Sequence, residues 1–117
     1  MVAMQWQGGV LSLLDQGAYP QEEKWLTCNT WEETAQALAT PAVQEEKVAA
    51  IAAAYGYAQA AIAAQDKLGT DAFQAALDQA KEQLLASRPG SRDVAAALAF
   101  VETPPEAYTK NADKPTA

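Results

Sequence analysis

Few residues in this chain are of the types that carry out chemistry at neutral pH. The 117 residues contain no histidine and a single cysteine, Cys28, so the usual proton shuttle and the commonest metal ligand are both missing. A lone cysteine cannot form an internal disulfide, and we expect Cys28 to be a small buried apolar side chain on a strand. The candidate acids and bases, Asp15, Glu45, Glu46 and Asp93, are typical of a solvated face, whereas acid–base catalysis needs a paired and shielded group. The sequence therefore predicts no metal, no cofactor, no disulfide and no catalytic residue.

The charge balance of the chain excludes two classes of partner. Eight basic and 15 acidic residues give a formal net charge of −7, which repels phosphate backbones and anionic lipid. No apolar run reaches the roughly 18 to 20 residues that span a bilayer, and the N-terminus lacks the pattern of a signal peptide. We therefore expect no nucleic-acid partner, no membrane partner and a cytoplasmic or recombinant synthetic origin.

The first 29 residues predict a β meander. Gly8-Gly9 tolerates the positive φ angles of a tight hairpin turn, so residues 4–7 and 10–15 should pair antiparallel. In residues 23–29 the side chains alternate in the manner of a third strand. The expected sheet has three antiparallel strands.

Residues 30–102 predict four helices. The capping box Thr30-Trp31-Glu32-Glu33 starts the first helix. Thr40-Pro41 then ends it and opens the second, which we expect to be continuous over residues 43–64. The third helix should start at Thr70-Asp71 and end near Ser87, and the fourth should run from about Ser91 to Val101.

Helical spacing predicts which side chains form the core. In the second helix Val48, Ile51, Tyr55, Ala58 and Ile62 make one apolar stripe, which we expect to be buried. A second stripe of small residues contains Ala52, Gly56 and Ala60, and it would let another helix approach closely. The predicted core is Val48, Ile51, Tyr55, Ile62, Phe73, Leu77, Leu84 and Leu98.

These elements predict an α+β fold, in which a small N-terminal three-stranded antiparallel sheet packs on a four-helix bundle. We expect a single domain over residues 1–103, with the meander in 1–29 and the bundle in 30–102, followed by a Pro-rich polar tail over 104–117. Periodicity by itself indicates no activity.

Several strings of the sequence resemble the N-terminal domain of methylthioribose-1-phosphate isomerase, a methionine-salvage enzyme related to the regulatory subunits of initiation factor 2B. The strings are LLDQ at 13–16, WLTC at 25–28, EETAQAL at 32–38, AAAYG at 52–56 and SRP at 87–89. They follow the family's order and spacing across nearly all of residues 5–100. The resemblance implies a small sheet packed on a helical bundle. It also implies that the catalytic cysteine and aspartate belong to a larger C-terminal α/β domain, so Cys28 is not the catalytic cysteine.

The departures from the family pattern affect its phosphate loop. Where the family carries Val-Arg-Gly-Ala-Pro-Ala-Ile-Gly, this chain reads Val43-Gln44-Glu45-Glu46-Lys47-Val48-Ala49-Ala50. Gln44 replaces the family's arginine, and two carboxylates replace glycine and alanine, so the site would oppose a phosphate. We expect Gln44 and Arg88 to be vestigial phosphate-side residues, the loop to be replaced by helix, and the chain neither to bind nor to isomerise methylthioribose-1-phosphate.

Three functions remain open. The first is an engineered stand-alone scaffold used as a protein-binding module. The second is a natural fragment or degenerate relative with a structural or dimerising role, and the third is an active enzyme. We favour the first, as a monomer or weak homodimer with a possible protein partner. The expected interface consists of positions that differ from the family without a folding reason: Pro41, Val43, Gln44, Lys47, Ala95, Ala96, Ala99 and Phe100. The alternative for these positions is that they only solubilise a cut surface. Trp31 is a second possible anchor, although its place on the first helix favours the core.

Overall fold

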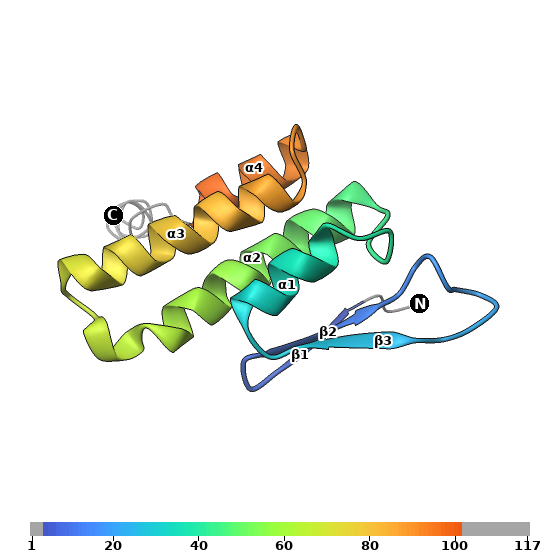
Figure 1. Ribbon diagram of the computed structural model, residues 1–117, viewed down its shortest axis with the longest axis horizontal. Helices are drawn as coiled ribbons and strands as arrows, with labels where there is room; N and C mark the ends of the chain where they lie inside the picture. The colour runs from blue at the N-terminus through green and yellow to red at the C-terminus, as the bar shows by residue number, and fades with distance from the viewer. Residues whose placement is uncertain (1–3, 102–117) are drawn as a thin grey trace, which may run out of the picture.

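The computed structural model describes residues 4–101 of the chain. Three antiparallel strands and four α-helices form an α+β fold, which confirms the predicted fold class. The sheet lies along one side of the helices, and α2 runs through the middle of the helical layer (Figure 1). The polar tail predicted over 104–117 lies outside the described residues, and the domain limits of 1–103 stay a prediction.

The sheet is the predicted meander. It contains β1 (Met4–Gln7), β2 (Val10–Leu14) and β3 (Trp25–Cys28) in the order β1-β2-β3. Gly8 and Gly9 join the first two strands with φ angles of +60° and +86°, which residues with a Cβ rarely adopt. The inner face of the sheet buries Leu11, Leu13 and Cys28.

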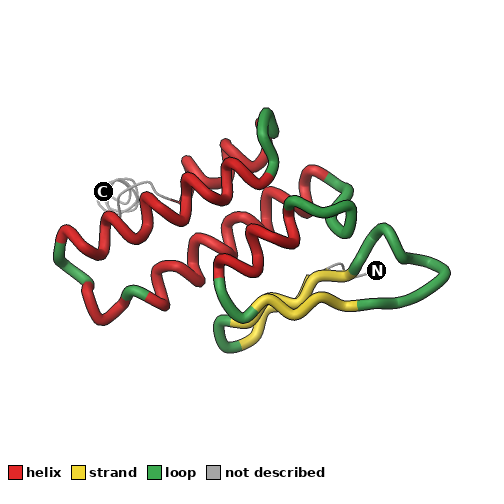
Figure 2. The backbone as a smooth tube through the Cα atoms, in the orientation of Figure 1, coloured by secondary structure: helices red, strands yellow, loops and turns green. Residues whose placement is uncertain are grey.

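The helices are α1 (Trp31–Leu38), α2 (Glu46–Ala63), α3 (Asp71–Ser87) and α4 (Arg92–Val101), with a 3₁₀ turn, η1 (Gln65–Lys67), after α2. Figure 2 shows the helices in red on one side of the yellow strands. At the start of α1 the Thr30 side chain accepts a hydrogen bond from the Glu33 amide at 3.2 Å, as predicted. The Glu33 carboxylate, however, accepts from the amide of Asn29 at 2.6 Å and not from that of Thr30. Thr70 caps α3 in the same way as Thr30 caps α1.

The predicted start of the second helix is wrong. Residues 40–45 form a bend, a turn and irregular backbone, and α2 begins at Glu46. Thr40 lies beyond the end of α1 at Leu38 and does not cap α2. Its hydroxyl donates to the carbonyl of Ala37 at 2.7 Å and accepts from the amide of Ala42 at 3.3 Å. The amides of Gln44 and Glu45 donate to the side-chain oxygen of Gln16, at 2.8 and 3.2 Å. These hydrogen bonds hold the loop in a non-helical conformation, although its residues have good helix propensity.

The buried face of α2 also differs from the prediction. The helix packs against α1, α3 and α4 through small residues, with Ala49, Ala52, Ala53, Gly56 and Ala60 buried. At Gly56 a Cβ would lie 3.0 Å from Leu84 Cδ2, so the small-residue stripe serves close packing as predicted.

Not all large side chains of α2 share this burial, although Tyr57 is 8 % exposed and belongs to the core cluster. Ile51 and Ile62 are 51 and 47 % exposed, which contradicts their assignment to the core, while Val48 and Tyr55 are half-buried. Tyr55 stacks on Trp6 of β1 with ring centroids 4.7 Å apart. The other predicted core positions fare better, because Leu77, Leu84 and Leu98 are buried and Phe73 is partly buried.

Candidate functional site

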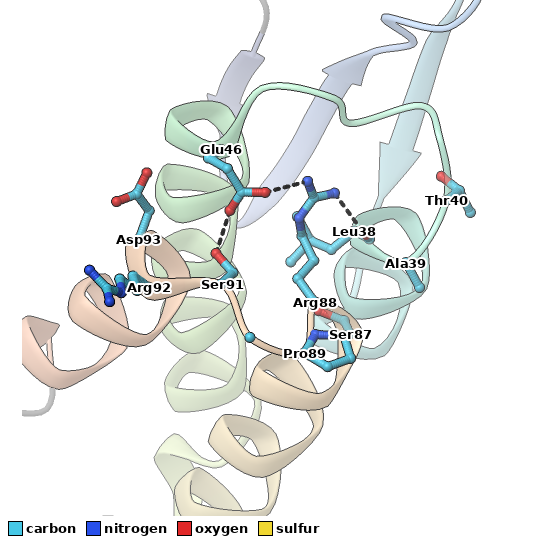
Figure 3. Close-up of a pocket in the computed structure, with 11 residues that line it drawn as sticks. Leu38, Ala39, Thr40, Glu46, Ser87, Arg88, Pro89, Ser91, Arg92 and Asp93 are labelled. Atoms are coloured by element: carbon cyan, nitrogen blue, oxygen red, sulfur yellow. Dashed lines mark hydrogen bonds and ion pairs between the residues drawn. The ribbon is translucent and has the colours of Figure 1, made fainter.

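A pocket of about 600 Å³ opens where the C-terminus of α1, the N-terminus of α2 and the turn between α3 and α4 meet (Figure 3). Its lining carries both signs of charge, from Glu46 and Asp93 on one hand and Arg88 and Arg92 on the other. The pocket contains Arg88, the residue that the sequence assigned to the vestigial phosphate side. Gln44, the other such residue, is exposed on the loop before α2.

Arg88 follows the last residue of α3 and binds three different segments of the chain. Its Nη1 donates to the carbonyl oxygens of Leu38, at 3.1 Å, and Val43, at 2.7 Å. Its Nη2 donates to Glu46 Oε2 at 2.8 Å. These hydrogen bonds join the end of α1, the loop and the start of α2 at one guanidinium. The Arg88 side chain is only 17 % exposed, so this guanidinium is shielded from solvent.

Glu46, the first residue of α2, receives donors from two sides. Besides the guanidinium on Oε2, its Oε1 accepts a hydrogen bond from the hydroxyl of Ser91. The hydrogen bonds from Arg88 and then from Ser91 hold the pKa of the Glu46 carboxyl below its ordinary value. Figure 3 shows the carboxylate between the two donors.

Ser91 precedes α4 and has a second role there. Its Oγ accepts a hydrogen bond from the amide of Val94 at 3.2 Å, which is the geometry of a helix N-cap. The same hydroxyl therefore positions the start of α4 and donates to Glu46.

Gln16 organises the neighbouring loop, and sequence reasoning gave it no role. Its backbone amide donates to the carbonyl of Ala42 at 2.7 Å, and its side-chain Nε2 donates to Glu45 Oε1 at 2.9 Å. Together with the bonds that its Oε1 accepts from Gln44 and Glu45, these contacts make Gln16 the main partner of the loop. Gln16 ends the LLDQ string, so the string located the residue without indicating its contacts.

Most of the predicted interface residues lie at the surface. Pro41, Gln44 and Lys47 are exposed around the loop and the start of α2, and Ala95, Ala96, Ala99 and Phe100 are exposed on α4. Val43 is 2 % exposed and cannot contact a partner, because its side chain belongs to the core cluster. Trp31 is half-buried beside a groove of about 440 Å³ between α1 and α3.

Other features of the described residues indicate no reactive group. Cys28 is buried as predicted, and burial raises the pKa of its thiol. Within residues 4–101 no three His, Cys, Asp or Glu side chains are grouped as metal ligands would be. None of the helices in this part of the chain has the length and apolar character needed to cross a membrane.

Comparison with known proteins places this fold in a class. No family model matches the chain. The crystal structure of 5-methylthioribose 1-phosphate isomerase from Pyrococcus horikoshii OT3 superposes on 97 % of this chain and 31 % of its own length, with a TM-score of 0.77 and 22 % identity. Translation initiation factor eIF-2B subunit delta from A. fulgidus covers 83 % of this chain and 28 % of its own, with a TM-score of 0.71 and 28 % identity. The class is thus the α+β domain that these two kinds of protein share.

Sequence relatives narrow this class to one family. The chain is 34 % identical over 105 residues to methylthioribose-1-phosphate isomerase of Parasynechococcus marenigrum (strain WH8102), which covers 90 % of this chain and 28 % of the relative. It is 38 % identical over 101 residues to the enzyme of that name from Marinobacter nauticus. This match covers 86 % of this chain and 28 % of the relative. The chain is therefore a homologue of the N-terminal domain of the methylthioribose-1-phosphate isomerase family. It spans less than a third of the length of these relatives.

Proposed function

We propose that this chain is a non-catalytic domain of the methylthioribose-1-phosphate isomerase family, and that it acts by docking onto another protein domain. The observation that carries the proposal is the engagement of Arg88. Its guanidinium donates to the Glu46 carboxylate and to the carbonyls of Leu38 and Val43. These hydrogen bonds stabilise the fold. A substrate phosphate would have to compete with all of them.

The loop before α2 supports the same proposal. A phosphate site needs an arginine fork or free backbone amides. The amides of Gln44 and Glu45 instead donate to Gln16, and the carboxylates of Glu45 and Glu46 bring negative charge to the same corner. We therefore still propose that phosphate binding is lost, but for a different reason from the one the sequence indicated. The loop is not replaced by helix, and its amide donors are bound to Gln16 instead.

Among the residues that the structure describes, Cys28 and Glu46 have shifted pKa values that do not suit proton transfer at neutral pH. Burial keeps the Cys28 thiol protonated, and Arg88 and Ser91 keep the Glu46 carboxyl ionised. A general acid or base works best when its pKa lies near the working pH, and both shifts move away from that range.

The docking face we propose is the outer side of α4 together with the exposed part of the 40–47 segment. Ala95, Ala96 and Ala99 present little side-chain bulk, and Phe100 is 66 % exposed beside them, which suits an interface with one aromatic anchor. The partner we propose is the part of an isomerase-family protein that this chain does not span, because the relatives are more than three times as long as the matched region. The proposal is the same for an engineered scaffold and for a natural fragment, since it depends on the folded surface.

The substrate half of the proposal is tested by titrating the chain with methylthioribose-1-phosphate, followed by calorimetry and phosphorus NMR. We expect no saturable binding and no isomerisation. A dissociation constant at or below about 100 μM, a free energy near −5.5 kcal/mol, would contradict the proposal.

The docking half is tested in a chimera, in which this chain replaces the matching part of the Parasynechococcus marenigrum enzyme. We expect the chimera to unfold in one cooperative transition and to lack isomerase activity. Ala96→Lys and Phe100→Ala should separate this transition into two, whereas Glu82→Ala on the exposed side of α3 should leave it intact. An active chimera, or one that ignores the α4 substitutions, would contradict the proposal.

A further inference from the structure

We infer that the outer strip of α2, made of Ile51, Ala54, Ala58 and Ile62, is an interface at which a second copy of this chain packs its own α2 in the antiparallel direction. The strip is separate from the docking face on α4, and only Lys47 borders both surfaces. Association through the strip needs no isomerase-family partner, so it is independent of the proposed function.

The strip is apolar and open to solvent. Ile51 and Ile62 are 51 and 47 % exposed, and the two alanines between them are half-buried. Over residues 48–63 α2 carries no charged side chain, although the whole chain has a net charge of −7. Exposed apolar side chains that gather on one helix face, without charges among them, are typical of an interaction surface.

The side chains of the strip fit a second copy of the strip. Ile51 and Ile62 lie at its two ends, about 16 Å apart along the helix axis, and the small alanines lie between them. Two such helices can approach closely over the alanines when they run antiparallel, and each isoleucine then packs beside an isoleucine of the other copy. This contact uses the same surface on both copies, so a twofold axis closes it as a dimer.

The charges at the two ends of the strip favour the antiparallel direction. Lys47 lies one turn before Ile51, and Asp66 lies about one turn after Ile62, in η1. The point midway between Ile51 and Ile62 in the sequence is also midway between Lys47 and Asp66. The axis that pairs the isoleucines therefore brings each Lys47 toward Asp66 of the other copy.

Other charges around the Ile62 end set the strength of the contact. Glu32 lines a pocket together with Ile62, and the C-terminal end of α2 carries the negative pole of the helix dipole, so both attract a lysine. Lys67 belongs to the same turn as Asp66 and weakens this attraction. One helix pair also buries less than the roughly 1,200 Å² of a stable interface. We therefore expect a weak dimer, with a dissociation constant of about 0.1 to 1 mM.

Sedimentation equilibrium of the full chain, over about 10 μM to 2 mM, measures this association. We expect the wild type to dimerise in this range. Ile51→Glu and Ile62→Glu should stay monomeric, a rise of at least about 10-fold in the dissociation constant, because each places a charge in an apolar contact. Leu68→Glu is the matched control, since Leu68 is 71 % exposed and lies outside the strip, and it should dimerise as the wild type does. Circular dichroism checks that each variant is folded.

A charge swap tests the antiparallel direction. Lys47→Glu and Asp66→Lys should each weaken the dimer about 2- to 5-fold. The double variant should regain the wild-type affinity, because the pair is restored across the interface with its signs exchanged. The two residues are separated by about 28 Å of helix, which is too far for them to pair within one chain, so the rescue must come from the other copy.

A wild-type chain that is monomeric up to about 2 mM would overturn the inference, and so would a dimer that Leu68→Glu disrupts as strongly as Ile51→Glu. A dimer that ignores both strip variants but is lost in Ala96→Lys would place self-association on α4 and overturn it as well. A double variant that binds no more tightly than the single variants would overturn the antiparallel arrangement. None of these results bears on the proposed function, which the sugar-phosphate titration and the chimera test separately.

Discussion

The hydroxyl of Thr34 on α1 donates a hydrogen bond to the side-chain oxygen of Gln59 on α2 at 2.6 Å, and both side chains are buried. The amide nitrogen of the same glutamine donates to the carbonyls of Cys28, at 2.8 Å, and Gly9, at 3.0 Å. One side chain in the middle of the helical layer thus holds α1, the hairpin turn and the end of β3.

We predict that Gln59→Ala lowers the free energy of unfolding by about 2 to 4 kcal/mol, because it leaves two main-chain carbonyls without their donor. Urea denaturation measures the change. Gln79→Ala, on an exposed position of α3, is the control and should change stability by less than about 0.5 kcal/mol. Equal effects of the two substitutions would show that the buried hydrogen bonds add no stability.

Truncation of Leu84 should destabilise the fold much more than truncation of Ile51. Leu84 is fully buried against Gly56, so Leu84→Ala should cost about 2 to 5 kcal/mol. Ile51 is 51 % exposed, and Ile51→Ala should cost less than about 1 kcal/mol, since little apolar area leaves the interior. Chemical denaturation of both variants decides the matter, and a large cost at Ile51 would mean that its side chain is covered in solution.

The contribution of Glu46 to stability should depend on pH. Arg88 and Ser91 lower the folded-state pKa of this carboxyl below the ordinary value of 4.5, so the native state favours its ionised form. The resulting stability is fully present above the unfolded-state pKa and is lost as the pH falls through the folded-state value. Wild type and Glu46→Gln should therefore differ in urea midpoint at pH 7 and converge as the pH drops below about 4. A constant difference across this range would contradict the ion pair.

Cys28 should react slowly with thiol reagents in the native state. The thiolate is the reactive form, and burial both raises the thiol pKa and blocks access. We expect labelling at pH 8 to be much slower in the native protein than in denaturing urea, because reaction needs transient opening. Gln59→Ala should speed the reaction, since it frees the carbonyl of Cys28 from its donor. Rapid labelling of the native wild type would place the thiol at the surface.

Features that depend on neighbours in the chain could be predicted from the sequence. Gly8-Gly9 specifies a tight hairpin because glycine adopts positive φ at little cost. Thr30 and Thr70 mark helix starts because their hydroxyls reach amides three residues on, and both caps are present. The small-residue stripe around Gly56 likewise indicated that another helix packs closely on α2.

Only the tertiary structure decided where α2 begins and which way it faces. Gln16, 28 residues before Gln44, binds the loop amides, and no local propensity reveals a partner so distant in sequence. Three helices pack on α2 closely enough that small side chains fill much of its inner face, and Ile51 and Ile62 of the periodic stripe are left exposed. The convergence of Arg88, Glu46 and Ser91 has the same origin. These residues belong to segments more than 40 positions apart, and only the packing of the helices brings the charges together.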